Sequence, residues 1–178
     1  MASSRGYRTG LFLTVAADGL VGGFRARHHA ASVARRLPPH ITLLFPFVQA
    51  SAVDDALRSD LAEFCATLAP FEAELARVGR FDRHVWLAPE PRDRFVELIR
   101  ATRARFPASG RPERERGDPV PHLTIAAVDA GDSAERVAAL ARAELEPLLP
   151  FGFSVSSVSL LEEGTDGFWH ELGRFGLG

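Results

Sequence analysis

The amino-acid sequence predicts an α+β fold: a bilobal, pseudo-twofold duplication of β-α-β-α-β units, with mainly antiparallel sheets around a central cleft. Three observations lead to this prediction. Short strand-like runs alternate with amphipathic helices along the 178 residues. A proline followed by His-x-Thr and an apolar residue occurs twice, as PHITL and PHLTI. A Pro-Phe pair also precedes the closing strand of each half. The two halves therefore share one order of features, which is typical of an internal duplication.

The first repeat, expected over about residues 8–80, begins with the apolar run LFLTVA, which indicates a strand. An amphipathic helix follows, and Pro38 and Pro39 end it because proline disrupts a continuing helix. The apolar run that contains the first His-x-Thr indicates another strand, and FEAELARV alternates as a half-buried strand does. The expected strands are 11–16, 40–48 and 71–78, and the expected helices are 21–36 and 52–68.

The second repeat, expected over about residues 84–176, has the same order of elements. The main difference in length is the polar segment 107–119, which is rich in Gly, Pro and Arg and is typical of a loop. The expected strands are 84–88, 122–128, 153–161 and 168–175, and the expected helices are 92–106 and 133–149. Both repeats are expected to form one two-lobed domain over residues 1–178.

The composition excludes several classes of chemistry. The chain has 46% hydrophobic and 25% charged residues and a net charge of -2, so nothing in its overall charge favours a polyanion. It has no lysine, which excludes Schiff-base, lysyl-adenylate and P-loop mechanisms. The single cysteine, Cys65, allows neither an internal disulfide nor a cysteine-based metal cluster. No apolar stretch is long enough to span a membrane. We therefore expect a cytoplasmic monomer with no membrane partner.

The two His-x-Thr motifs carry the candidate chemistry. A single His-x-Thr is a weak signal, whereas two copies at matching places of a repeat are improbable by chance. Side chains two residues apart in a strand point to the same face, so His40 lies beside Thr42 and His122 beside Thr124. The alternate residues Ile41, Leu43, Phe45 and Phe47, with Leu123, Ile125 and Ala127, are expected to face the core. A twofold axis then brings the two polar faces together.

Two facing imidazoles suit phosphoester chemistry. A histidine titrates near neutral pH, so one ring can accept a proton from the attacking group while the other gives a proton to the leaving oxygen. The two threonine hydroxyls can donate to non-bridging phosphate oxygens. No acidic residue stands beside either motif at the spacing of a zinc site, so neither a metal nor another cofactor is expected.

The duplicated chain with two His-x-Thr-apolar motifs resembles the 2H phosphoesterase superfamily, close to the bacterial 2′-5′ RNA ligase and RNA 2′,3′-cyclic phosphodiesterase group. The resemblance covers nearly the whole chain. It implies a bilobal fold, metal-independent catalysis, His40 and His122 as the acid and base, and Thr42 and Thr124 as phosphate-binding residues. It also implies substrates with 2′,3′-cyclic phosphates or 2′-5′ linkages. The arginine that the RNA ligase branch often carries shortly after its second motif is absent here, where the run is HLTIAAVD.

Three further residues are weaker candidates for substrate contacts. Trp86 could stack a nucleobase or belong to the core. Arg111 lies in the loop before the second motif, where it could hold a phosphate, although nearby acidic residues favour a solvated loop. His170 could line the cleft.

The sequence thus predicts a phosphodiesterase that hydrolyses the 2′,3′-cyclic phosphate of RNA ends or small nucleotides, or transfers or ligates a 2′-5′ linkage. Its partner would be a small nucleotide or an RNA-end phosphate. The alternatives are a catalytically idle RNA- or nucleotide-binding module of the same fold, and a phosphoesterase of a non-nucleotide cyclic phosphate such as an ADP-ribose derivative.

Overall fold

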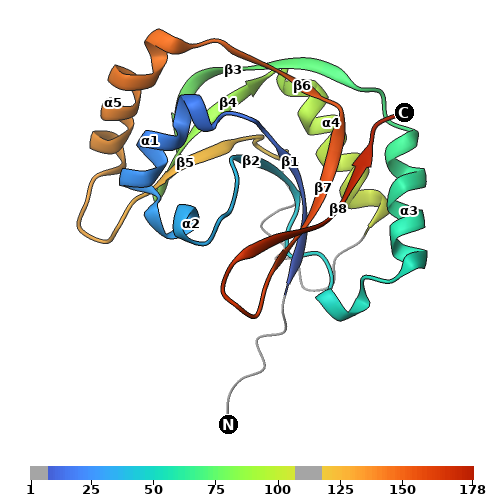
Figure 1. Ribbon diagram of the computed structural model, residues 1–178. Helices are drawn as coiled ribbons and strands as arrows, with labels where there is room; N and C mark the ends of the chain where they lie inside the picture. Colours follow the sequence, from blue (N-terminus) through green and yellow to red (C-terminus); the bar gives the residue numbers. More distant parts are fainter. Residues whose placement is uncertain (1–7, 107–117) are drawn as a thin grey trace.

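A computed structural model describes residues 8–106 and 118–178 of the chain. Within these residues an eight-stranded antiparallel sheet has the order β6-β3-β4-β5-β2-β1-β7-β8. Figure 1 shows that this sheet is strongly curled. The strands are β1 (Thr9–Thr14), β2 (His40–Leu44), β3 (Phe71–Arg80), β4 (His84–Glu90), β5 (Leu123–Ala127), β6 (Phe151–Val155), β7 (Ser157–Glu163) and β8 (Trp169–Gly176).

Five α-helices are described, and they lie against the sheet in two groups (Figure 1). They are α1 (Asp18–His28), α2 (Ala30–Ala34), α3 (Asp55–Ala66), α4 (Arg92–Arg105) and α5 (Ala134–Leu145). Helix α1 contacts β5, and α5 contacts β3 and β4. Helix α4 contacts β2 and β4, and α3 contacts β8. No helix of the described residues is both long and apolar enough to cross a membrane.

The strand pairing shows the internal duplication. Ile41 pairs with Leu123 between β2 and β5, and each is the residue after its motif histidine. Ala73 pairs with Phe153 between β3 and β6, and each lies three positions after the proline of its Pro-Phe pair. Equivalent residues therefore face each other at both places, as a twofold axis requires. The predicted antiparallel α+β fold with an internal duplication is confirmed.

The two repeats are interleaved in the sheet. The closing strand of the first repeat, β3, pairs with β4 of the second repeat. In the same way β7 of the second repeat pairs with β1 of the first. The bounds of the two repeats, 8–80 and 84–176, stay a prediction made from the sequence.

Two expected elements are divided in the structure. The helix expected over 21–36 is two helices, α1 and α2, because the backbone leaves the helical conformation at His29, with φ -145° and ψ 38°. The strand expected over 153–161 is β6 and β7, separated by Ser156. The chain changes its partner strand there, from β3 to β1, so one regular strand cannot continue.

The expected alternation of buried residues holds in the middle of each motif strand and fails at its end. Ile41, Leu43, Leu123 and Ile125 are fully buried, as predicted. Phe45 and Ala127 were expected in the core, but Phe45 is half-buried beyond the end of β2 and Ala127 is exposed. Their neighbours Leu44 and Ala126, which strict alternation would place on the face of the histidines, are fully buried instead. Irregular pairing between β1 and β2 and between β4 and β5 shifts the alternation there.

Candidate active site

The structure brings the two His-x-Thr motifs onto neighbouring strands. Strand β2 begins at His40, and β5 begins directly after His122. The pairing of Ile41 with Leu123 sets an antiparallel register in which each histidine lies opposite the threonine of the other motif. Since Ile41 and Leu123 point into the core, the four motif side chains share the opposite face. All four are half-buried.

Both imidazoles are held in the same way. Nδ1 of His40 lies 2.8 Å from the carbonyl oxygen of Pro38, and Nδ1 of His122 lies 2.7 Å from that of Val120. A carbonyl can only accept a hydrogen bond, so Nδ1 carries the proton in each ring. This fixes the tautomer of the neutral ring and leaves Nε2 as the nitrogen that can accept or release a proton.

The protein disfavours the charged form of both rings. Burial lowers the pKa of His40 to about 4. The bond to Pro38 opposes this effect, and the positive charges of Arg25, His122 and His29 add to it. Burial also lowers the pKa of His122, and the nearby His84 adds to the effect. The free protein therefore holds His40 neutral at pH 7.

An aromatic ring supports each histidine. Phe12 of β1 meets His40 edge-on, with ring centroids 4.9 Å apart. Phe81 meets His122 edge-on at 5.1 Å, and Trp86 of β4 lies 6.1 Å from the same ring. Such edge-to-face contacts hold a ring in one orientation.

Strand pairing shows that Phe12 and Trp86 hold equivalent places in the two repeats. Phe12 pairs with Thr42, and Trp86 pairs with Thr124. The sequence prediction left Trp86 open between the core and a base-stacking role. Only 9% of the residue is exposed, so Trp86 packs beside His122 and has little free surface on which a base could stack. Trp86 pairs with Gly79 of β3, which has no side chain.

Trp169 is a candidate that the sequence reasoning missed. Its half-buried ring lies 5.8 Å from Phe12 and 5.8 Å from Phe45, and Phe12 in turn contacts His40. The backbone N–H of Trp169 donates to the carbonyl of Arg35 at 2.8 Å, which fixes the start of β8. The spacing of the sequence gives no signal for this, because β8 lies far from β2 along the chain.

No described contact places the two other predicted residues, His170 and Arg111, beside the motifs. His170 is exposed, and its Nε2 lies 3.0 and 2.9 Å from the carboxylate oxygens of Asp166. Arg111 lies outside the described residues. No group of three or more His, Cys, Asp or Glu side chains in the described part of the chain could hold a metal ion.

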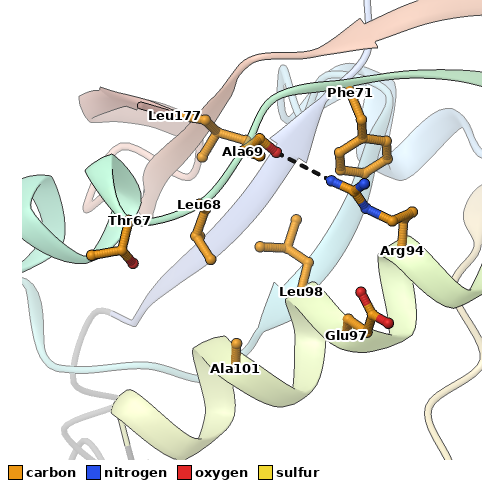
Figure 2. Close-up of a pocket in the computed structure, with 9 residues that line it drawn as sticks. All are labelled: Thr67, Leu68, Ala69, Phe71, Arg94, Glu97, Leu98, Ala101 and Leu177. Atoms are coloured by element: carbon orange, nitrogen blue, oxygen red, sulfur yellow. Dashed lines mark hydrogen bonds between the residues drawn. The ribbon is translucent and has the colours of Figure 1, made fainter.

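A pocket lies away from the motifs, between the end of α3, helix α4 and Leu177 (Figure 2). Figure 2 shows Arg94 reaching across it toward Ala69 and lying against the ring of Phe71. None of the four motif residues lines this pocket.

Comparisons with known proteins agree with the fold. A family model described as the 2′-5′ RNA ligase superfamily matches residues 14–167. E. coli LigT complexed with NADP+ is similar in structure, with a TM-score of 0.63 and 20% identity, over 98% of this chain and 99% of that chain. E. coli LigT complexed with 3′-AMP has a TM-score of 0.58 and 19% identity, over 96% and 98% of the two chains. TT0787 of Thermus thermophilus has a TM-score of 0.54 and 17% identity, over 96% and 97%. No curated protein sequence matches the chain significantly.

Proposed function

Because the chain belongs to the 2′-5′ RNA ligase superfamily, we propose that it is a phosphodiesterase that opens 2′,3′-cyclic phosphates of RNA ends or small nucleotides. One observation carries the proposal: the pairing of Ile41 with Leu123 brings both motifs to one face of the sheet. In both histidines the hydrogen bond that fixes the ring uses Nδ1, which leaves Nε2 for proton transfer. Two proton-transfer groups and two hydroxyls on one face are the parts that an in-line displacement at phosphorus needs.

The reaction divides its two proton transfers between the histidines. Nε2 of the neutral ring takes a proton from water, and the water oxygen forms a bond to phosphorus. The bond from phosphorus to the 2′ or the 3′ oxygen breaks, and the protonated ring gives its Nε2 proton to that oxygen. The hydroxyls of Thr42 and Thr124 donate to the non-bridging oxygens, whose negative charge grows in the transition state. When the 5′-hydroxyl of another ribose attacks in place of water and the bond from phosphorus to the 3′ oxygen breaks, the product is a 2′-5′ linkage.

Substrate binding must restore one proton to the pair. The low pKa of His40 and the lowered pKa of His122 describe the free protein, where both rings favour the neutral form. A bound phosphate anion raises the pKa of both rings because it stabilises the imidazolium. The anionic substrate therefore brings the pair into the state with one acid and one base.

Two half-buried aromatic side chains are the candidates for holding a nucleoside. Phe81 lies beside His122, and Trp169 lies beside Phe12, which contacts His40. Stacking of a base on an aromatic ring contributes about 1–3 kcal/mol in single-strand binding proteins. The nucleotides 3′-AMP and NADP+ in two structures of similar fold support a nucleotide as the class of ligand.

The test is the turnover of a panel of substrates in EDTA. The panel contains the four 2′,3′-cyclic nucleotides, an RNA with a 2′,3′-cyclic end, 2′-5′ dinucleotides and a cyclic phosphate of ADP-ribose. We expect hydrolysis of at least one cyclic nucleotide or cyclic RNA end, unaffected by the chelator. Activity that EDTA abolishes contradicts the proposed chemistry. Binding of nucleotides without turnover of any of them indicates the idle binding module, and turnover of the ADP-ribose compound alone indicates the non-nucleotide substrate.

A further inference from the structure

Within the function proposed above, we infer that Arg25 is a positioning residue for His40: it fixes the segment that carries the ring and places a buried positive charge behind it. Arg25 falls within the helix that the sequence predicts over 21–36, and no pattern in the sequence signals a role for it. In the structure only 3% of the residue is exposed.

The first line of evidence is a chain of hydrogen bonds. Nη2 of Arg25, on α1, donates to the carbonyl oxygen of Leu37 at 2.8 Å. The next carbonyl along the chain, that of Pro38, accepts the bond from Nδ1 of His40 at 2.8 Å. Arg25 therefore holds the backbone one residue before the carbonyl that orients the catalytic ring. A shift of that backbone moves the His40 ring with it.

The second line of evidence is that this buried charge has no ion-pair partner within the described residues. Nε of Arg25 is buried and has no hydrogen-bond partner there. Burial lowers the pKa of its guanidinium, and Asp18 opposes that effect through its charge. Burying a charge with no opposite charge beside it is unfavourable. A neutral side chain could hold the Leu37 carbonyl without this cost, so the charge itself has a use.

The second repeat has a similar contact between an arginine and the backbone before its motif, but its arginine is not buried. Nη2 of Arg92, at the start of α4, donates to the carbonyl oxygen of Pro119 at 3.4 Å. Pro119 precedes His122 by three residues, as Leu37 precedes His40. The side chain of Arg92 is 43% exposed, however, so water screens its charge. Both repeats thus have an arginine that contacts this backbone, but only the arginine of the first repeat is buried and acts through its charge on a motif histidine.

The charged and titratable groups that act on His40 come from three places. Arg25 lies on α1, His29 lies between α1 and α2, and His122 precedes β5. Of these only the guanidinium is charged throughout the pH range of the reaction. Its removal therefore raises the pKa of His40. Because kcat/KM reports the groups of the free enzyme, one limb of its pH profile must move to higher pH.

The experiment compares Arg25→Gln, which keeps a hydrogen-bond donor without the charge, with Arg25→Lys, which keeps the charge. Arg27→Gln is the matched control, because Arg27 lies on the same helix, is 53% exposed and pairs with Glu144. The first readout is the titration of the His40 ring protons by NMR, which needs no substrate. A failure of the proposed activity therefore leaves this test intact. The second readout is the pH profile of kcat/KM.

We expect the His40 midpoint in Arg25→Gln to rise by about one pH unit or more, with a matching shift of one limb of the profile. Arg25→Lys should stay near the wild type, and Arg27→Gln should not change. A folded Arg25→Gln protein with the wild-type His40 midpoint overturns the inference, and so does an equal shift in Arg27→Gln. Should Arg25→Gln fail to fold, Arg25→Met takes its place, because it also removes the charge: a His40 midpoint above that of the wild type supports the inference, and an unchanged midpoint overturns it.

Discussion

Ile41 and Leu123 pair directly between β2 and β5, and each is the residue that follows the histidine of its motif. This one pair explains how two motifs far apart in the sequence become one site. Both side chains are fully buried, so the pair is fixed by the core. The neighbours of each residue along its strand must then point away from the core, and those neighbours are the histidine and the threonine of each motif.

The threonine hydroxyls provide a first test of the site. Valine has nearly the same shape as threonine but no hydroxyl, so Thr42→Val and Thr124→Val remove one hydrogen-bond donor each. We expect each variant to lower kcat/KM by about 10²-fold, as loss of one donor to a developing charge does, while the melting temperature stays near that of the wild type. Steady-state kinetics and thermal unfolding check this.

The matched control is Thr67→Val. Thr67 is exposed, and its hydroxyl donates to Phe64 at the end of α3. A loss of activity in this variant equal to the loss at either motif threonine contradicts the assigned roles.

Gly79 provides a test of the aromatic wall beside His122. A Cβ atom at this position would lie 2.6 Å from Cζ2 of Trp86, so an alanine must displace the indole. We expect Gly79→Ala to lower the free energy of unfolding by about 1–3 kcal/mol through overpacking. We also expect kcat/KM to fall, because Trp86 packs near His122.

Gly176→Ala is the control, since a Cβ there meets no atom within 4 Å. Urea unfolding and kinetics of the two variants decide. If Gly79→Ala has the stability and activity of the wild type, the position of the Trp86 ring matters for neither, and the prediction is wrong.

Two half-buried histidines, His29 and His40, predict how the stability of the protein depends on pH. Burial, with the charges of Arg25 and His84, lowers the pKa of His29 to about 4, whereas an unfolded chain has a histidine pKa near 6.5. The unfolded state thus binds the proton first as the pH falls. The stabilising contribution is complete above pH 6.5 and is lost between pH 6.5 and 4. His40 contributes in the same direction.

His29→Gln removes one of these two contributions. We expect the decrease in the free energy of unfolding between pH 7 and pH 4.5 to be smaller in this variant than in the wild type, and smaller again when His40→Gln is added. Urea unfolding at the two pH values measures it. A wild-type stability that does not change over this range refutes the prediction.

Trp169 predicts a contact with the base of the substrate. We expect Trp169→Leu to raise KM for a 2′,3′-cyclic nucleotide by about tenfold, which corresponds to the loss of one stacked base. The same variant should not change KM for ribose 2′,3′-cyclic phosphate, which has no base. Equal effects on both substrates would place the role of Trp169 in folding rather than in recognition.

The sequence was sufficient to predict the fold class and to predict that the two motifs lie side by side, as the pairing of Ile41 with Leu123 shows. The alternation of Ile41, Leu43, Leu123 and Ile125 is a local property of each strand, and the duplication is visible as repeated letters. The same alternation failed at Phe45, which lies beyond the end of β2. The pairing with β1 is irregular there, and this depends on the neighbouring strand rather than on the local sequence.

Residues that act through contacts across the fold could not be found in this way. Arg25 lies in the run FRARHH, which is typical of a solvated helix face, and only the position of Leu37 beneath α1 shows its role. Phe81 contacts His122, and Trp169 contacts Phe12, which in turn contacts His40. No short spacing in the sequence connects Phe81 or Trp169 to the motifs.

The central claim is that His40 and His122 serve one reaction as a pair. The most direct measurement is the kcat/KM of His40→Ala, His122→Ala and the double variant on a 2′,3′-cyclic nucleotide in EDTA. We expect each single variant to lose about 10²–10⁴-fold, and the double variant to be little slower than the slower single variant, because groups that act as a unit are not additive. A single variant that keeps wild-type activity, or losses that multiply in the double variant, would contradict the claim.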